Sequence, residues 1–232
     1  MPRLRGTPKV PIGTTYRLEG EDYAFAVYIG HMRNKKNKAK GVKEQKFTAT
    51  KSSVEVSVQG LIGEAAFLRL FGLPLDPLYD TTPSCAKTDR GDAFLQSGEK
   101  VDVKTTVPWA KGILASAAKK EYPPTLYALM TMLEHNEKDH YALLRFDGFM
   151  SAAFVTQDRW ETRKGKDGRF VSYLAPRAYL KSLQDVREDF GHTESREDLE
   201  VGEVFSWDVK PTEENWKILF TREQGGMRVS RR

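Results

Sequence analysis

The chain is poor in the features that mark several common protein classes. Cys85 is its one cysteine among 232 residues, which excludes an intrachain disulfide and any zinc module built on several cysteines. No stretch approaches the ~18 consecutive apolar residues of a membrane-spanning helix, and the charged N-terminus lacks the apolar core of a secretory signal. We therefore expect no membrane association and a reducing setting such as the cytoplasm, which for a phage-encoded protein is the host's.

Motifs for several other kinds of chemistry are also missing. The sequence contains no glycine-rich motif of the Walker or dinucleotide-binding type. The four histidines show no metal-ligand spacing, since even His135 and His140 are five residues apart and miss a shared helix face. Cys85 has no histidine near it in sequence and is interpreted as an ordinary thiol. These residues are therefore weaker candidates for a functional site than the acids and the lysine considered below.

Charge is distributed unevenly along the chain. The net charge is +5, yet residues 33–51 contain eight basic residues and one acid, a local charge of 8 − 1 = +7. Residues 185–203 contain eight acids and two arginines, a local charge of 2 − 8 = −6. Such a distribution favours binding of a polyanion along the basic segment, although solvated helix faces can have the same composition.

Hydrophobic periodicity predicts an α/β or α+β protein with a mixed sheet, of which we favour α/β. A helix from residue 21 to about 46 ends in basic residues. A second helix over 56–71 is apolar nearly all round; Ser57 is its expected cap, and Gly72 with Pro74 its stop. The other expected elements are an irregular lead-in over 1–20, strands at 92–95, 100–107, 113–117 and 125–133, a hairpin of 141–146 and 149–155 turning at Asp147 and Gly148, helices at 158–163 and 176–189, and late strands at 205–208 and 216–220.

The strand over 100–107 places an acid and an amine together. In the sequence KVDVKTTV, Asp102 and Lys104 share one face and lie about 6.8 Å apart, and the opposite face is aliphatic. This pair suits metal-assisted hydrolysis, in which the acid holds a hard cation and the ammonium stands near the attacking water. Acid-x-Lys also begins at Glu44 and Asp208, about the number expected by chance, but only the Asp102 copy lies in an alternating strand that closes a hairpin.

Asp92 opens the other strand of this hairpin, where aspartate has poor intrinsic propensity. A three-residue loop over 96–98 would place Asp92 across from Asp102 on the same face, whereas a two-residue turn would place it on the other face. The alternative interpretation is that Asp92 caps a turn.

Glu64 lies on the apolar helix, where a buried carboxylate is costly unless it pairs or binds a cation. Gly60 and Gly63 would let this helix approach a sheet closely. The alternative is a glutamate on a helix face that reaches solvent.

Three short motifs occur in order: Gly60-x-x-Gly63-Glu64-Ala65-Ala66, then Gly91-Asp92, then Val101-Asp102-Val103-Lys104-Thr105-Thr106. Together they resemble the PD-(D/E)XK nuclease superfamily, over residues 54–133 approximately, with Gly91 at the usual proline position. The resemblance implies a restriction-endonuclease-like core of order αβββαβ, a mixed β-sheet flanked by helices. The helix between its third and fourth strands has little room here. After the lead-in, we expect one nuclease domain over 21–232, with a basic helical segment to 51, a core over 54–155 and an extension from 156.

The resemblance also implies a divalent-metal-dependent nuclease that hydrolyses phosphodiester bonds in DNA. Asp92 and Asp102, with the Val103 carbonyl, would hold Mg²⁺ or Mn²⁺; Glu64 would bind a second ion or a metal-bound water, and Lys104 would orient the water. A homodimer would suit paired cuts. The basic residues expected to hold the DNA backbone are Arg33, Lys35, Lys36, Lys38, Lys40 and Lys43.

Two alternatives belong to other functional classes. One is a nucleic-acid-binding protein that retains the fold without turnover, against which the intact set of site residues argues. The other is a protein that acts on a protein partner through its acidic C-terminal part.

Overall fold

The computed structural model describes residues 8–39, 51–79, 91–117, 123–164 and 170–189, together with two short strands near the C-terminus. The chain divides into two compact units, Met1–His192 and Thr193–Arg232. In the second unit, β9 (Thr221–Glu223) pairs antiparallel with β10 (Gly226–Arg228). The late strands predicted at 205–208 and 216–220 lie outside the described residues.

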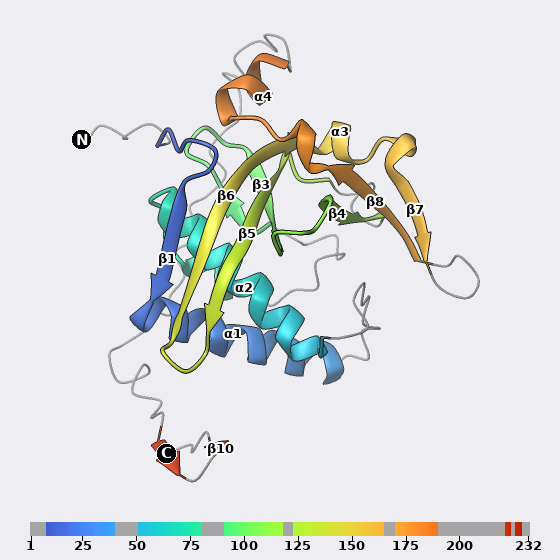
Figure 1. Ribbon diagram of the computed structural model, residues 1–232. Coiled ribbons are helices and arrows are strands. Elements are labelled where there is room, and N and C mark those ends of the chain that lie inside the picture. Colours follow the sequence, from blue (N-terminus) through green and yellow to red (C-terminus); the bar gives the residue numbers. More distant parts are fainter. Residues whose placement is uncertain are drawn as a thin grey trace, which may run out of the picture. The chain divides into compact units, whose positions relative to one another are not determined.

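The first unit is built on a five-stranded mixed sheet (Figure 1). Its order is β1 (Thr15–Glu19), β6 (Tyr141–Ser151), β5 (Leu126–Asn136), β3 (Lys100–Thr106) and β2 (Ala93–Phe94). Strands β3 and β5 run parallel, and every other neighbouring pair is antiparallel. The predicted α/β class with a mixed sheet is therefore confirmed.

Helices α1 (Gly20–Ala39) and α2 (Ser53–Leu70) cover one face of this sheet (Figure 1). Alternate strand residues, among them Val101 and Val103, join the helices in the main core. Phe67 of α2 packs edge-on against Phe149 of β6, with ring centroids 6.0 Å apart. The helix that sequence periodicity predicted to be buried on several sides thus lies between α1 and the sheet.

A second, smaller sheet packs against the opposite face of the five-stranded sheet, at β5. It has the antiparallel order β4 (Gly112–Ser116), β8 (Phe170–Pro176) and β7 (Glu161–Lys164). Its residues share a core with Tyr127 and Leu129 of β5. The remaining elements are η1 (Asp76–Tyr79), α3 (Ala152–Val155), η3 (Asp158–Trp160), η4 (Arg177–Tyr179) and α4 (Leu183–Asp189).

Two N-terminal predictions were wrong. The lead-in is not irregular throughout, because Thr15–Glu19 forms β1 and buries Leu18 against the helices. Ser52, not Ser57, caps α2. Its hydroxyl accepts the Glu55 N–H at 3.2 Å while the Glu55 carboxylate accepts the Ser52 N–H at 2.6 Å, a reciprocal capping box.

The turn predicted at Asp147 and Gly148 was also wrong. Strand β6 runs through both residues, and the turn lies earlier, between β5 and β6, where His140 has a positive φ of 57°. The pairing with β5 shifts between Leu129 and Met130, so Asp147 is the extra residue of a β-bulge. A local turn signal was overridden by the long β5–β6 ladder.

Other elements differ from the predictions in extent. The stretches predicted as helices at 158–163 and 176–189 form short 3₁₀ turns, a strand and the short α4. The αβββαβ order places a helix between its third and fourth strands, here β4 and β5. Residues 118–122 of that connection lie outside the described part, and the described residues 117 and 123–125 contain no α-helix. The helix predicted to about 46 is α1, and residues 40–46 lie outside the described part.

Candidate active site

The candidate site lies at the outer edge of β3. Strand β2 pairs with Lys100 and Val101 only, so beyond them this edge of β3 has no strand partner among the described residues. The loop of the hairpin spans 96–98: Leu95 N–H donates to the Glu99 carbonyl at 3.0 Å, and Gly98 N–H donates back to Leu95 at 2.9 Å. This is the odd-numbered loop that an arrangement with Asp92 beside Asp102 requires.

Asp92 is bonded to the backbone on both sides of Asp102. Its N–H donates to the Val101 carbonyl at 3.0 Å, and its carboxylate accepts the Val103 N–H at 2.7 Å. Because the N–H and C=O of one strand residue point to the same edge, the Val103 carbonyl also faces the Asp92 side of β3. The structure therefore brings Asp92, Asp102 and the Val103 backbone together.

Glu64 enters the site from α2 and is bound by Arg33 of α1. The guanidinium donates through both Nη atoms, at 3.0 and 3.2 Å, to the two carboxylate oxygens. The Glu64 side chain is 8% exposed and that of Arg33 20%, so this is a largely buried, bidentate ion pair. Sequence analysis assigned Arg33 to DNA phosphates, and the structure places it on Glu64.

Close packing of α2 on β3 positions Glu64. A Cβ atom on Gly63 would lie 1.8 Å from Thr105 Oγ1, whereas one on Gly60 would meet nothing nearer than Glu64 Oε1 at 3.9 Å. Gly63 is therefore required for the approach of the helix to the strand, as the sequence suggested, and Gly60 is not.

The site contains more negative than positive charge. Burial raises the pKa of Asp92 well above its usual range, and the negative charges of Glu64 and Asp102 raise it further. Lys104 and Arg33 act in the opposite direction without cancelling the effect. The charges of Glu64 on α2, Asp102 and Lys104 on β3 and Arg33 on α1 therefore all act on Asp92.

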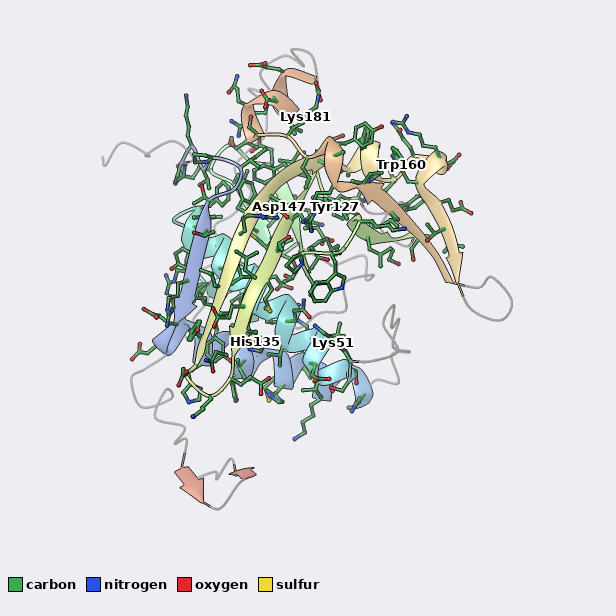
Figure 2. All side chains as sticks on the ribbon, in the orientation of Figure 1. Lys51, Tyr127, His135, Asp147, Trp160 and Lys181 are labelled. Atoms are coloured by element: carbon green, nitrogen blue, oxygen red, sulfur yellow. The ribbon has the colours of Figure 1, made fainter. Side chains whose placement is uncertain are left out.

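Lys104 forms an ion pair with Asp102 and lies on the same face of β3. Burial by itself lowers the pKa of Lys104, but the carboxylates of Asp102 and Asp92 outweigh burial and raise that pKa above its usual value. The ammonium is 5.8 Å from the ring centroid of Tyr127, whose side chain Figure 2 labels on β5. Lys104 is thus held as a cation. We call this group of side chains the carboxylate cluster: Glu64, Asp92, Asp102, Lys104 and Arg33.

The chemistry of this donor set fits a hard divalent cation, because carboxylate and carbonyl oxygens are its preferred ligands and the cluster holds three acids against two cations. In the described part of the chain, no three His, Cys, Asp or Glu side chains form a group that could hold a metal ion as they stand. Glu64 is turned to Arg33 and Asp102 to Lys104.

Three of the other predicted DNA-binding residues lie at the end of α1. Lys35, Lys36 and Lys38 are exposed, whereas Lys40 and Lys43 lie outside the described residues. Among the helices that the structure describes, none is long and apolar enough to cross a membrane.

A second polar cluster was missed by sequence analysis. The cluster surrounds Asp147, which Figure 2 labels at the β6 bulge. The Asp147 carboxylate accepts from Thr131 Oγ1 at 2.5 Å and from Arg145 Nε at 2.6 Å, and it lies 3.4 Å from Arg177 Nη1. Arg177 Nη2 also donates to Thr131 at 3.0 Å. The one sequence feature that could have indicated this cluster is Asp147, a charged residue inside an apolar stretch, but it was interpreted as part of a turn. We call these residues the arginine cluster: Arg145, Arg177, Asp147 and Thr131.

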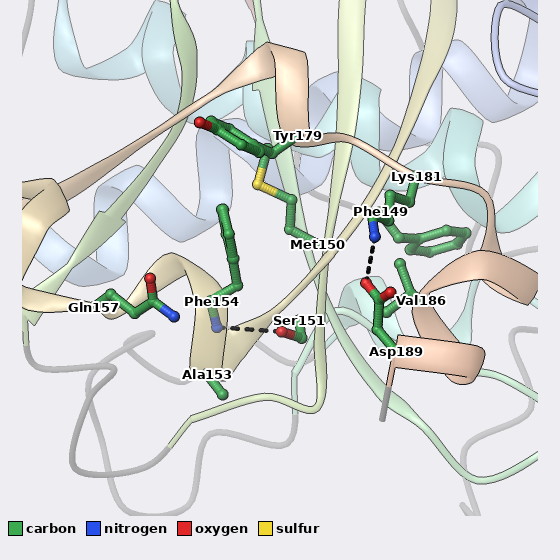
Figure 3. Close-up of a pocket in the computed structure, with 10 residues that line it drawn as sticks. All are labelled: Phe149, Met150, Ser151, Ala153, Phe154, Gln157, Tyr179, Lys181, Val186 and Asp189. Atoms are coloured by element: carbon green, nitrogen blue, oxygen red, sulfur yellow. Dashed lines mark hydrogen bonds and ion pairs between the residues drawn. The ribbon is translucent and has the colours of Figure 1, made fainter. Parts of the chain in front are cut away.

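An apolar pocket of about 360 Å³ contains none of the predicted site residues (Figure 3). Phe149, Met150 and Phe154 contribute to its wall, and an ion pair of 2.6 Å joins Lys181 to Asp189. Its one hydroxyl besides that of tyrosine, on Ser151, caps α3 by accepting the Phe154 N–H at 3.1 Å. Asp189 is the one acid among the residues that line the pocket, so we keep β3 as the location of the candidate site.

Fold and site together define an α/β protein with a mixed sheet, flanking helices and a polar cluster at one sheet edge. A family model described as "Family of unknown function (DUF5843)" matches residues 8–188. The chain belongs to this family. No curated protein and no solved structure matches the chain.

Proposed function

We propose that the protein is a divalent-metal-dependent deoxyribonuclease of the PD-(D/E)XK type. The observation that carries this proposal is the convergence of Glu64, Asp92, Asp102 and Lys104 at the open edge of β3, with the electrostatic coupling that raises the pKa of Asp92. Three carboxylates at one place are costly to bury unless a cation accompanies them.

Each side chain has a role in this proposal. Asp92, Asp102 and the Val103 carbonyl would supply oxygen ligands to Mg²⁺ or Mn²⁺, and Glu64 would join them on leaving Arg33. When bound, such an ion polarises phosphoryl oxygens and lowers the pKa of a bound water. Lys104, whose raised pKa keeps it charged, would stabilise negative charge on the phosphate during attack.

A second candidate is a DNA-binding protein with this fold but without turnover. Arg33 already neutralises Glu64 through two hydrogen bonds, and Lys104 is paired with Asp102. Permanent pairing of this kind would occupy two of the three carboxylates and leave too few oxygen ligands for a metal. The exposed lysines of α1 would serve either function, because phosphate contacts give affinity without chemistry.

The test is cleavage of supercoiled plasmid, linear duplex and single-stranded DNA with Mg²⁺, Mn²⁺ or EDTA. We expect cleavage with metal only, complete loss in Asp102→Asn, and a loss of about 10²-fold or more in Lys104→Met. Glu44→Gln, in another acid-x-Lys copy, is the control and should cleave normally. Cleavage by Asp102→Asn at the normal rate would place the nuclease site elsewhere. Binding without cleavage in any metal would favour the second candidate.

A further inference from the structure

The arginine cluster lies on the same sheet face as Asp102 and Lys104. On β6, Leu144 and Phe146 pack in the core beneath the helices, so Arg145 between them points to the opposite face. On β3, Val101 and Val103 take the helix side in the same way, which leaves Asp102 and Lys104 on the other.

The register fixes how far apart the two clusters are. Thr106, Thr131 and Arg145 stand opposite one another across β3, β5 and β6. Thr106 is two residues beyond Lys104, so the backbone of Thr131 is about 8 Å and that of Arg145 about 12 Å from Lys104, at ~3.3 Å per residue and ~4.8 Å between strands. Long arginine side chains can thus reach a nucleotide next to one held at Lys104.

The arginine cluster has the properties of a phosphate site. Asp147 is buried, with 6% of its surface exposed, and its carboxylate orients Arg145 by accepting a hydrogen bond from Nε. Within the described residues, Nε is the one side-chain atom of Arg145 that forms a hydrogen bond. The side chains of Arg145 and Arg177 are 35% and 24% exposed. Two guanidinium groups against one carboxylate leave an excess of positive charge, and the planar fork of Arg145 suits phosphate.

An exposed tryptophan adjoins these arginines. Trp109 lies in the turn closed by the bond from Ala110 N–H to the Val107 carbonyl, 3.0 Å, and is 82% exposed. Arg177 holds this turn, since its Nη atoms lie 3.4 Å from the carbonyls of Val107 and Pro108. An exposed indole beside phosphate-binding groups is the arrangement on which unpaired bases stack.

We propose that Trp109 and the arginine cluster form a subsite for one unpaired nucleotide of a DNA strand. Arg145 holds its phosphate, Arg177 adds positive charge beside it and fixes the turn that carries Trp109, and Trp109 stacks on its base. The faces of bases inside a duplex are covered by their neighbours, so the subsite selects a single-stranded segment beside the cleaved bond. This inference rests on the proposed nuclease function for the position of the cleaved bond, but the subsite itself binds without metal.

Binding of the full chain to labelled single-stranded and duplex oligonucleotides, measured by fluorescence anisotropy in EDTA, tests the tryptophan. Trp109→Ala should weaken single-strand binding about tenfold and change duplex binding less than twofold, because stacking acts on the open base. Trp109→Phe should keep most of the affinity. Tyr28→Ala, an exposed aromatic on α1, is the control. Equal effects of Trp109→Ala on both DNAs, or no effect, would overturn the proposal.

The arginines are tested in the same titrations at several salt concentrations. Arg145→Gln should weaken single-strand binding about fivefold and reduce its salt slope by about one phosphate contact. Arg177→Gln, which releases the turn that carries Trp109, should also weaken single-strand binding about fivefold. Arg69→Gln, which removes the same charge from α2, should not. If Arg177→Gln fails to fold, Arg145→Gln carries the test. Behaviour of Arg145→Gln like Arg69→Gln would make the arginine cluster a purely structural network. Because no cleavage is involved, failure of the nuclease proposal would show separately in the metal-dependent assay.

Discussion

The carboxylate cluster and the arginine cluster lie in one sheet and have opposite charge balances. The first holds three acids against two cations at the open edge of β3, and the second holds one acid against two arginines at the β6 bulge. Each is stabilised by internal ion pairs, yet each retains an excess of one sign. The carboxylate cluster is suited to a cation and the arginine cluster to an anion, and a metal-dependent nuclease needs both kinds of site.

The clusters also differ in how they are built. The carboxylate cluster joins side chains from α1, α2 and β3, so its geometry depends on how the helices pack on the sheet. The residues of the arginine cluster come from β5, β6 and η4, and none of them comes from α1 or α2. Changes at the helix–sheet contact should therefore separate the two.

The largest effect is expected from Arg33→Met, which leaves Glu64 without its bidentate partner. We expect a loss of about 3 kcal/mol in the free energy of unfolding in EDTA, the lower end for a broken buried pair because Arg33 is 20% exposed. Mn²⁺ should recover part of this loss, since Glu64 becomes free to bind it. Denaturant titrations with and without Mn²⁺ measure both. The control, Arg69→Met, breaks the more exposed pair with Asp22 and should cost about 1 kcal/mol or less, with no response to metal. Equal losses in the two variants would contradict the account.

Gly63→Ala should be next in size. The added Cβ collides with Thr105 at 1.8 Å and pushes α2 from β3, with a loss of about 1–3 kcal/mol and a displaced Glu64. Metal binding should weaken, whereas DNA binding in EDTA through the arginine cluster should persist. Gly60→Ala is the matched control on the same helix. It meets only Glu64 Oε1 at 3.9 Å and should be neutral or stabilising by up to ~1 kcal/mol. Two equally stable variants would show that α2 does not depend on this contact.

Thr131→Val tests the arginine cluster in isolation. It removes a buried hydroxyl that donates to Asp147 and accepts from Arg177, at a cost of about 1–2 kcal/mol. Metal binding at β3 should be unchanged, as measured by calorimetry. Thr14→Val, which removes an exposed bond to the Pro11 carbonyl, should cost only a few tenths of a kcal/mol. A loss of metal binding in Thr131→Val would show that the clusters are coupled.

The smallest effect belongs to a region with neither cluster. His135 of β5 lies far from Asp147 of β6 (Figure 2). Its Nε2 is 2.9 Å from the Tyr23 hydroxyl. Burial lowers the pKa of His135 below 6.5, so the unfolded chain binds its proton more readily. The stability associated with neutral His135 is therefore complete above about pH 6.5 and is lost as pH falls toward its lower folded pKa. His135→Gln should reduce the difference in unfolding free energy between pH 7 and pH 5, and an unchanged difference would argue against this contribution.

Local patterns in the sequence predicted the elements of the carboxylate cluster because each signal was short-range. Alternation over 100–107 gave the shared face of Asp102 and Lys104, and the hairpin placed Asp92 once its loop was known to have three residues. The pairing of Arg33 with Glu64 was not predicted, because Arg33 was grouped with the basic residues around it as a contact to DNA. Its spacing of three and four from Gly30 and Ile29, both buried, would have put it on the inner face of α1.

Long-range pairing accounts for the rest of what the sequence did not predict. The parallel pairing of β3 with β5 and the β1–β6 pair join segments far apart in sequence. Asp147 and Gly148 have the composition of a tight turn, but the ladder on either side continues and makes them a bulge. The arginine cluster depends on that bulge and on Arg177, which comes from a turn distant in sequence. A local sequence pattern therefore could not predict it.

In the proposed function, Asp92, Asp102 and Glu64 together bind a divalent cation. The most direct test of this binding is calorimetric titration of Mn²⁺ into the full chain and into the Asp92→Asn/Asp102→Asn double variant, with Asp139→Asn, an exposed aspartate of the β5–β6 turn, as the control. We expect saturable binding to the wild type and the control, and its loss in the double variant. Equal Mn²⁺ binding by all three proteins, or none by the wild type, would contradict the proposed function.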